Sequence, residues 1–149
     1  MANTDYQRIL LPMEFSEHCY RAARHAAQLA GWSGGAVHLA HVVENPLDPI
    51  YEPEAVQHWV VVEHADKKAR ELLEAVAARC LPAETPRELH VLSGDPYPKI
   101  MALAEQINAD LIVLATHGTS SLAHRLLGGI AEKVTHHARC PVLLVREAS

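Results

Sequence analysis

The chain has 149 residues, of which 49% are hydrophobic and 21% are charged, so its length and composition are those of a globular domain. The same composition excludes a disordered, collagen-like or coiled-coil chain. The formal net charge of −5 at pH 7 argues against a protein that coats nucleic-acid phosphates, and we expect no nucleic-acid partner.

Two strands and a helix are predicted in the first third of the chain. Residues 6–12 form a short apolar run that ends in a proline. Ser16 is a candidate N-cap for a helix whose small apolar side chains recur every three or four residues as far as Gly31. Residues 36–43 form a second strand, and a loose stretch with several prolines, 45–53, follows it.

The central third predicts a long helix, a strand and a second helix. Apolar spacing favours a helix over residues 54–80, although the β-branched run 60–62 is also compatible with a short strand. Residues 89–92 form a third strand, and Asp95 and Pro96 favour a helix N-terminus directly after it. The expected buried stripes are Ala55, Trp59, Val62, Ala65, Ala69, Leu72, Val76 and Cys80 in the first helix, and Ile100, Met101, Ala104 and Ile107 in the second.

The last third completes an alternation of five strands and four helices. Residues 111–115 are apolar on both faces, as in a covered parallel strand. A helix over about residues 128–138 and a strand at 142–145 follow a glycine-containing loop. This alternation predicts an α/β fold with a doubly wound parallel sheet, in a single domain that spans residues 1–149.

The carboxyl ends of the strands are where such a sheet binds its ligand, which points to residues 12–16, 42–44 and 115–121. Gly118 lies in the loop after the fourth strand, and Gly128 and Gly129 open the last helix. Glycines allow a close approach to a ligand, and free N–H groups at a helix start favour an anion, so this loop is a candidate phosphate cradle. The spacing matches neither of two common phosphate-binding motifs and is equally compatible with glycines that serve only in turns and caps.

Five stretches of the chain stand out in order: 9–16 (ILLPMEFS), 41–44 (HVVE), 94–96 (GDP), 109–118 (ADLIVLATHG) and the closing stretch 128–145, which ends in CPVLLV. Together they resemble landmarks of the universal stress protein family. The resemblance covers nearly the whole chain and is weakest at 45–62. It implies a Rossmann-like, adenine nucleotide α-hydrolase-like fold: a five-stranded parallel sheet of order 3-2-1-4-5 with two helices on each face.

The nucleotide-binding branch of that family carries the pattern G-x-x-G-x(9)-G-[ST] after the fourth strand, which falls here on Ala115, Gly118, Gly128 and Gly129. The two central glycines are present, whereas Ala115 replaces the first glycine and Gly129 replaces the hydroxyl residue. Gly129 keeps the backbone N–H but loses a side-chain hydrogen bond worth about 0.5–1.5 kcal/mol. Glu14 stands where the family commonly has an aspartate near the adenosine.

The resemblance implies that ATP, with or without Mg²⁺, binds to a dimeric stress-response or regulatory module. The implied nucleotide-binding residues are Pro12, Met13, Glu14, Val42, Leu114, Ala115, His117, Gly118, Thr119, Gly128, Gly129 and Ile130, with Val42 and Leu114 against the adenine. Two alternatives stay open. One is a slow ATPase that uses the same site, for which Glu14 is the only candidate carboxylate. The other is a nucleotide-free dimeric protein that acts through its surfaces.

The last strand predicts a homodimer. Val142, Leu143, Leu144 and Val145 are apolar at every position of a strand that the resemblance places at the sheet edge, and no lysine protects that edge. Dimers of the family pair these strands antiparallel across a two-fold axis, which satisfies the free backbone groups of both chains. A rival interpretation covers this edge with the chain's own segment 45–53 and leaves a monomer.

From the cysteines, histidines and hydropathy of the chain we expect no disulfide, no metal site and no membrane span. Cys19, Cys80 and Cys140 form neither a disulfide framework nor a zinc pattern and are interpreted as apolar fillers in a reducing cytosol. We expect no metal site, since the adjacent His136 and His137 point about 100° apart on a helix. No signal-peptide pattern opens the chain and no apolar run reaches the roughly 18 residues of a membrane span, which favours a cytoplasmic protein without membrane insertion.

Overall fold

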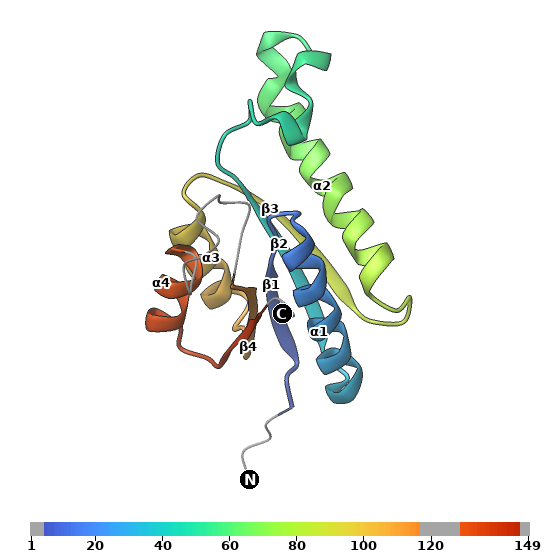
Figure 1. The fold of residues 1–149 in the computed structure, drawn as a ribbon, viewed down its shortest axis with the longest axis vertical. Helices are drawn as coiled ribbons and strands as arrows, with labels where there is room; N and C mark the ends of the chain where they lie inside the picture. The colour runs from blue at the N-terminus through green and yellow to red at the C-terminus, as the bar shows by residue number, and fades with distance from the viewer. Residues whose placement is uncertain (1–4, 117–128, 147–149) are drawn as a thin grey trace.

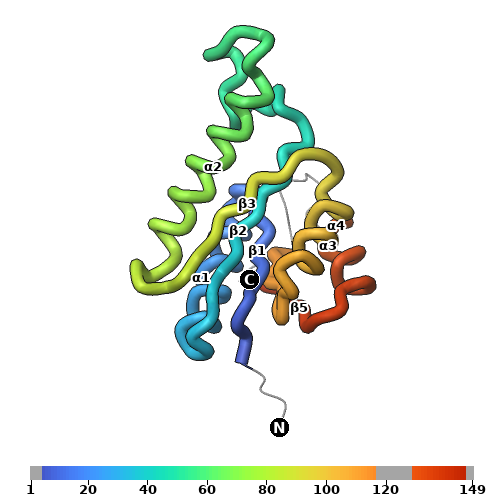
Figure 2. Tube along the Cα trace, turned by 180° about the vertical axis from the view of Figure 1, so that it is seen from behind, coloured from blue at the N-terminus to red at the C-terminus, as the bar shows by residue number. Residues whose placement is uncertain are grey.

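A five-stranded parallel sheet forms the centre of the computed structural model, which describes residues 5–116 and 129–146 (Figure 1). The strand order is β3-β2-β1-β4-β5, as predicted. Helices α1 and α2 cover one face and α3 and α4 the other (Figures 1 and 2). The strands are β1 (Arg8–Pro12), β2 (Ala36–Val43), β3 (Arg87–Ser93), β4 (Leu111–Ala115) and β5 (Val142–Val145). The helices are α1 (Glu17–Ser33), α2 (Val61–Cys80), α3 (Pro96–Gln106) and α4 (Gly129–His137).

Alternation along each strand divides the core between the two faces. In β1, Ile9 and Leu11 pack with α1 and α2, whereas Leu10 packs with α3 and α4. Leu114 of β4 joins the second cluster, so this strand is apolar on both sides, as a doubly covered parallel strand requires. Burial of apolar area on both faces fixes the position of the strand ends, and these ends carry the candidate site.

Helix α1 lies close to the sheet because its buried stripe consists of small side chains. The stripe contains Cys19, Ala22, Ala23, Ala26, Ala27 and Ala30. Ser16 occupies the N-cap position but makes no side-chain capping hydrogen bond, and the helix continues past the predicted end at Gly31 to Ser33. Gly34 closes it with φ 73°, and a Cβ at the next residue, Gly35, would overlap the main-chain oxygen of Tyr6. Glycine at Gly35 is therefore required by a close approach of two backbone segments.

The segment that precedes α2 differs from the prediction. Residues 49–60 form three short 3₁₀ turns, η1 (Pro49–Tyr51), η2 (Pro53–Ala55) and η3 (His58–Val60), and α2 begins only at Val61. Neither a helix from residue 54 nor a strand at 60–62 is present: the backbone is extended at Val56 (φ −131°, ψ 162°) and Gln57 (φ −76°, ψ 151°), and Val60 ends a 3₁₀ turn. Segment 49–60 packs against α2 and projects from the end of the molecule opposite β5, so it does not cover that edge (Figures 1 and 2).

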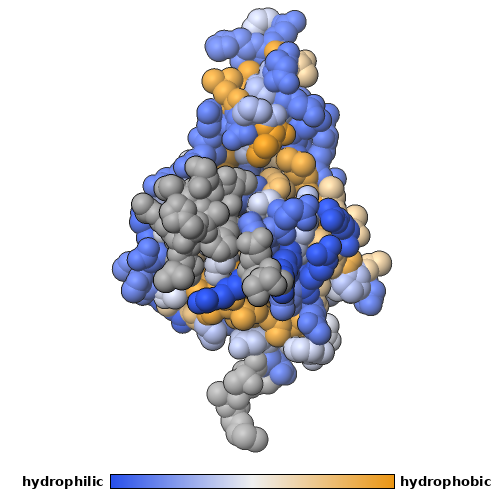
Figure 3. All heavy atoms as spheres, viewed as in Figure 1, coloured by the Kyte–Doolittle hydropathy of each residue, from blue (hydrophilic) through white to orange (hydrophobic). Residues whose placement is uncertain are grey.

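Three residues predicted on the buried stripe of this helix, Ala55, Trp59 and Val62, lie on the surface. Trp59 is 79% exposed and Val62 is 58% exposed, because the helix starts later and its first turn extends beyond the sheet. In Figure 3, hydrophobic patches interrupt the polar surface over this projecting part. Farther along α2, Ala65, Ala69 and Val76 are buried as expected.

The start of β1 is tied to the start of β4 by one carboxylate. The Asp110 side chain accepts hydrogen bonds from the backbone N–H groups of Gln7 and Arg8, each at 2.9 Å. The guanidinium of Arg8 also lies 3.7 Å from the same carboxylate. These bonds fix the register of the two central strands at their amino ends. Within 5–116 and 129–146, no helix is long and apolar enough to cross a membrane.

Candidate functional site

A cavity of about 770 Å³ opens at the carboxyl ends of β1, β2 and β4. This is the position that the crevice rule for doubly wound sheets predicts, and the volume is in the usual range of small-molecule sites. Described residues that line it are Pro12, Met13, Glu14, Cys19, Ala40, His41, Val42, Glu44, Asn45, Asp48, Ile50, Tyr51, Pro96, Ile100, Leu114, Ala115, Thr116, Gly129, Ile130 and Ala131.

The turn after β1 presents Glu14 to this cavity. The backbone N–H of Met13 donates to the oxygen of Ala40 at 2.7 Å, which extends the pairing with β2 by one residue. The N–H of Glu14 donates to Sγ of Cys19 at 3.3 Å, so the first turn of α1 also holds the loop. Phe15 adopts a left-handed conformation with φ 65°, which is strained for an aromatic residue. Packing of its ring on His41, with centroids 4.5 Å apart, holds it there.

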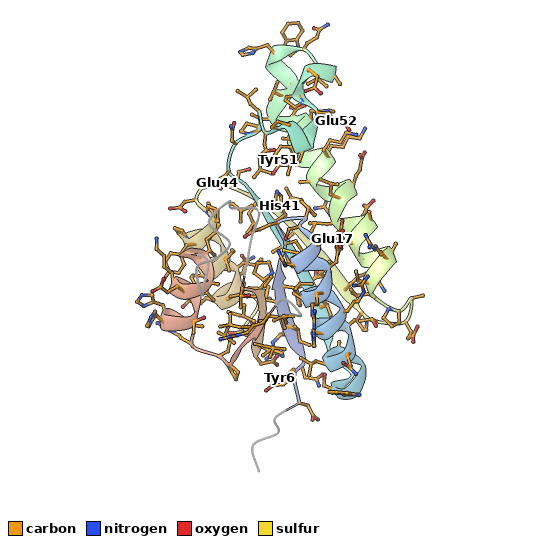
Figure 4. All side chains as sticks on the ribbon, viewed as in Figure 1. Tyr6, Glu17, His41, Glu44, Tyr51 and Glu52 are labelled. Carbon is orange, nitrogen blue, oxygen red and sulfur yellow. The ribbon has the colours of Figure 1, made fainter. Side chains whose placement is uncertain are left out.

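His41 connects this turn to the segment after β2. Its Nδ1 lies 2.7 Å from the main-chain oxygen of Met13, which can only accept, so Nδ1 carries the proton. Nε2 then accepts a hydrogen bond from the hydroxyl of Tyr51 in η1 (Figure 4). Burial lowers the pKa of His41, and the bond to Met13 and nearby carboxylates offset this only in part. The neutral ring therefore holds both walls of the cavity together.

Tyr51 closes the cavity on the side of the projecting segment. Its side chain is buried among Val43, Ala65 and Ala69. Burial, reinforced by the nearby carboxylates that include Asp48, raises the pKa of Tyr51 to about 12, so the hydroxyl remains a donor at physiological pH.

The cavity walls combine apolar surface with carboxylates. Val42 of β2 and Leu114 of β4 belong to the same apolar cluster, which Ile130 of α4 joins from the other side. The carboxylates that line the cavity are those of Glu14, Glu44 and Asp48. Among the described residues of the lining there is no lysine or arginine. The described part of the lining therefore offers an anionic ligand backbone dipoles rather than a cationic side chain.

The end of β4 and the start of α4 provide neutral hydrogen-bonding groups. Oγ1 of Thr116 is buried at the cavity and has no hydrogen-bond partner within the described part of the chain. A buried hydroxyl without a partner is costly, and a bound ligand would satisfy it. Gly129 is the first residue of α4, and a Cβ built on it meets nothing within 4 Å, so space for a ligand lies beside the helix start.

The residues expected from the sequence and the residues that line the cavity overlap at its core. Pro12, Met13, Glu14, Val42, Leu114, Ala115, Gly129 and Ile130 all line it. His117, Gly118, Thr119 and Gly128 lie outside the described residues. The sequence analysis missed His41, Tyr51 and Asp48. His41 lies in a strand that reads as apolar, and the other two belong to the irregular stretch 45–53, so only a histidine within an otherwise apolar strand gave any signal.

The chain is similar to known proteins over nearly its whole length. The sequence profile of the universal stress protein family matches residues 5–146. A universal stress protein of Thermus aquaticus is 35% identical over 143 residues, which cover 95% of this chain and 99% of that protein. A universal stress protein of Methanocaldococcus jannaschii is 32% identical over 143 residues, which cover 95% of this chain and 83% of that protein.

Solved structures share the fold. The universal stress protein UspA of Lactobacillus plantarum superposes with a TM-score of 0.76 at 25% identity, covering 97% of this chain and all of that one. A universal stress protein in complex with cAMP gives 0.65 at 24% identity, covering 95% of this chain and 98% of that one. The universal stress protein of Archaeoglobus fulgidus in complex with dAMP gives 0.63 at 19% identity, with the same two coverages.

Proposed function

The chain belongs to the universal stress protein family, and from this premise we propose that it is a regulatory module that binds an adenine nucleotide, ATP foremost, at the carboxyl ends of β1, β2 and β4. The observation that carries the proposal is the cavity of about 770 Å³ at this position, where apolar walls and hydrogen-bonding groups converge. Family members solved with cAMP and with dAMP support it, because both ligands consist of an adenine, a sugar and a phosphate.

The walls of the cavity suit the two ends of a nucleoside differently. Val42 and Leu114 offer apolar contacts for the adenine, as the family resemblance implies. Glu14 and Glu44, at the ends of β1 and β2, are acceptors for sugar hydroxyls or for the exocyclic amine of adenine. The hydroxyl of Thr116, which has no hydrogen-bond partner among the described residues, adds a hydrogen-bonding group on the β4 side.

The phosphates are the more demanding part of the ligand. With Glu14, Glu44 and Asp48 in the lining and no lysine or arginine among its described residues, a triphosphate meets a negative field. We therefore expect Mg²⁺ to accompany ATP and the N-terminus of α4 at Gly129 to contribute its dipole. The glycines 118 and 128 of the family pattern belong to the same proposal.

The proposed role is that of a binding module, in a single domain, rather than a catalyst. None of the described residues that line the cavity forms a nucleophile and base pair: Cys19 is buried and its pKa is raised by burial, and the Tyr51 hydroxyl and neutral His41 are engaged with each other. We further propose that the protein is a homodimer that pairs through β5, and that nucleotide binding changes the surface of this dimer. Slow ATP hydrolysis at the same site remains the second candidate, with Glu14 as the carboxylate.

Thermal unfolding with and without nucleotide tests the proposal. MgATP at a hundred times its dissociation constant is expected to stabilise the chain by about 2.7 kcal/mol, which raises the melting temperature by roughly 5–10 °C. GTP serves as the matched ligand, with the same charge and a different base. No shift with millimolar MgATP, or an equal shift with MgGTP, would favour a nucleotide-free protein or a nonspecific anion effect instead. Appearance of ADP during the incubation would favour the ATPase.

A further inference from the structure

A cluster of three metal-ligand side chains lies on β2 and β3, outside the cavity lining. His38 of β2 and Glu88 of β3 are register partners, and His90 lies two residues farther along β3. Because side chains alternate along a strand, all three point to the same face of the sheet. Figure 2 shows β3 at the edge of the sheet, with α1 and α2 on one side and α3 and α4 on the other.

The three ligand atoms converge on one point. Nδ1 of His38 lies 3.0 Å from Nε2 of His90 and 3.1 Å from Oε2 of Glu88, and all three atoms lie within 4.8 Å of one another. A tetrahedral zinc ion with Zn–N bonds of about 2.0–2.1 Å separates its ligand atoms by about 3.3 Å. The observed spacings therefore approach those of three corners of a zinc tetrahedron, and small side-chain rotations would complete it.

The protonation of the cluster suits a metal ion. Nδ1 of His38 is within hydrogen-bonding distance of both a ring nitrogen and a carboxylate oxygen, so one N–H proton is shared among three potential ligand atoms. Burial lowers the pKa of His38 and, in the same way, that of His90, and both rings are neutral at physiological pH. Neutral imidazole is the form that binds a metal, and a divalent cation would take the place of the shared proton.

Exposure differs across the cluster in a way that leaves one coordination position open. The His38 side chain is 9% exposed, whereas that of Glu88 is 67% exposed. A metal held here would have a rigid inner ligand on β2 and would face solvent on the side of Glu88, where water completes the coordination. Arg8 and Arg70 lie near enough to oppose a cation weakly, which favours moderate rather than very tight affinity.

We propose that His38, Glu88 and His90 form a binding site for a divalent transition metal, with Zn²⁺ as its best occupant. Two imidazoles and one carboxylate are a ligand set that zinc accepts in proteins, together with a water molecule. The site connects the edge strand β3 to β2. Bound metal therefore stabilises this edge of the sheet independently of nucleotide binding.

Titration of the full chain, freed of any purification tag and of metal, tests the site. We expect one Zn²⁺ per chain by calorimetry and a tetrahedral visible spectrum when Co²⁺ is the probe. Glu88→Gln is a safe first variant because the side chain is exposed and the amide still accepts a hydrogen bond. Glu88→Gln and His90→Ala are each expected to weaken Zn²⁺ binding at least about tenfold. Loss of a residue that only hydrogen-bonds to a metal ligand already lowers metal affinity by about tenfold or more.

His25→Ala is the matched control, because His25 is exposed on α1 and lies outside the cluster. This variant is expected to bind Zn²⁺ with the affinity of the wild type. Absence of saturable binding by the wild type up to about 1 mM Zn²⁺ would overturn the site. The site would also be overturned if Zn²⁺ bound equally well to His90→Ala, Glu88→Gln and His25→Ala, because the metal would then be held by other histidines. Far-UV circular dichroism of each variant ensures that a loss of binding is not a loss of fold.

Discussion

Nδ1 of His41 lies 2.7 Å from the main-chain oxygen of Met13, so a side chain of β2 holds the turn that follows β1. The same ring accepts a hydrogen bond from Tyr51 and packs on Phe15, whose φ of 65° it helps to maintain. Three chain segments that converge on the cavity are thereby fixed by one neutral imidazole. The position of Glu14 depends on this arrangement rather than on β1 alone.

The His41 contacts predict a stability that falls in acid. The pKa of His41 is lowered in the folded chain, and so are those of His38 and His90, so the unfolded chain binds more protons as the pH falls below about 6.5. The free energy of unfolding is therefore highest above this pH, as far as these three histidines determine it, and decreases below it. Urea denaturation at a series of pH values between pH 8 and pH 5 measures the effect.

Replacement of His41 measures how much this residue contributes to the loss of stability in acid. His41→Phe is expected to lower the free energy of unfolding at pH 8 by about 1–3 kcal/mol, because the Met13 oxygen and the Tyr51 hydroxyl lose their buried partner. The variant is also expected to lose less stability between pH 8 and pH 5 than the wild type does. An unchanged pH profile would mean that His41 is not among the groups whose protonation opposes folding.

A hydroxyl at residue 129 is expected to tighten ATP binding. The family pattern has serine or threonine there, and a Cβ on Gly129 meets nothing within 4 Å, so Gly129→Ser fits the fold. One added hydrogen bond of about 0.5–1.5 kcal/mol corresponds to an affinity gain of roughly 2- to 12-fold by calorimetry. Gly31→Ser is the control, because Gly31 also has free space but lies in α1, away from the cavity. Equal gains in both variants would contradict a phosphate role for the start of α4.

The Asp110 carboxylate is expected to contribute strongly to stability. It accepts two backbone hydrogen bonds, from Gln7 and Arg8, and Asp110→Ala removes both acceptors. Hydrogen bonds to a charged group are worth about 1.5–3 kcal/mol each, so a loss of at least about 2 kcal/mol is expected in urea denaturation. Glu105→Ala is the comparison, since the Glu105 ion pair with Arg139 is exposed on both sides. A loss no larger than in that variant would show that β1 is held by its apolar packing alone.

The β5 edge predicts a variant that separates dimerisation from folding. The oxygens of Pro141 and Val145 accept hydrogen bonds from Ile112 in β4 and from Thr116 directly after it. Backbone groups of successive residues point to opposite sides of a strand, so the N–H of Leu144, next to Val145, points away from β4. Leu144→Pro removes an outward donor and keeps the bonds to β4, and it is expected to yield a chain of about 16.4 kDa by light scattering. Leu144→Ala loses side-chain packing but keeps the N–H, and is expected to remain dimeric. A monomeric wild type would exclude this interface.

The alternation of elements and most of their ends could be predicted from the sequence by itself. Ala36–Val43, Leu111–Ala115 and Val142–Val145 are observed with the predicted bounds, because an apolar run between glycine or proline signals leaves little choice of period. Strand order came from the family resemblance, whose motifs lie at the strand ends. Gly129 and Glu14 were identified because local rules for helix starts and strand ends locate them.

Contacts between distant segments were decided only by the tertiary structure. Trp59 fits a helical stripe, yet it is exposed because it lies in η3, before α2 begins, and no local pattern records where the helix starts. His41 and Tyr51 meet because residues 45–50 fold back over the end of β2. His38, Glu88 and His90 are separated by up to 52 residues and converge through the parallel register of β2 and β3. Periodicity specifies which face a side chain takes, whereas register and packing determine which other side chain it meets there.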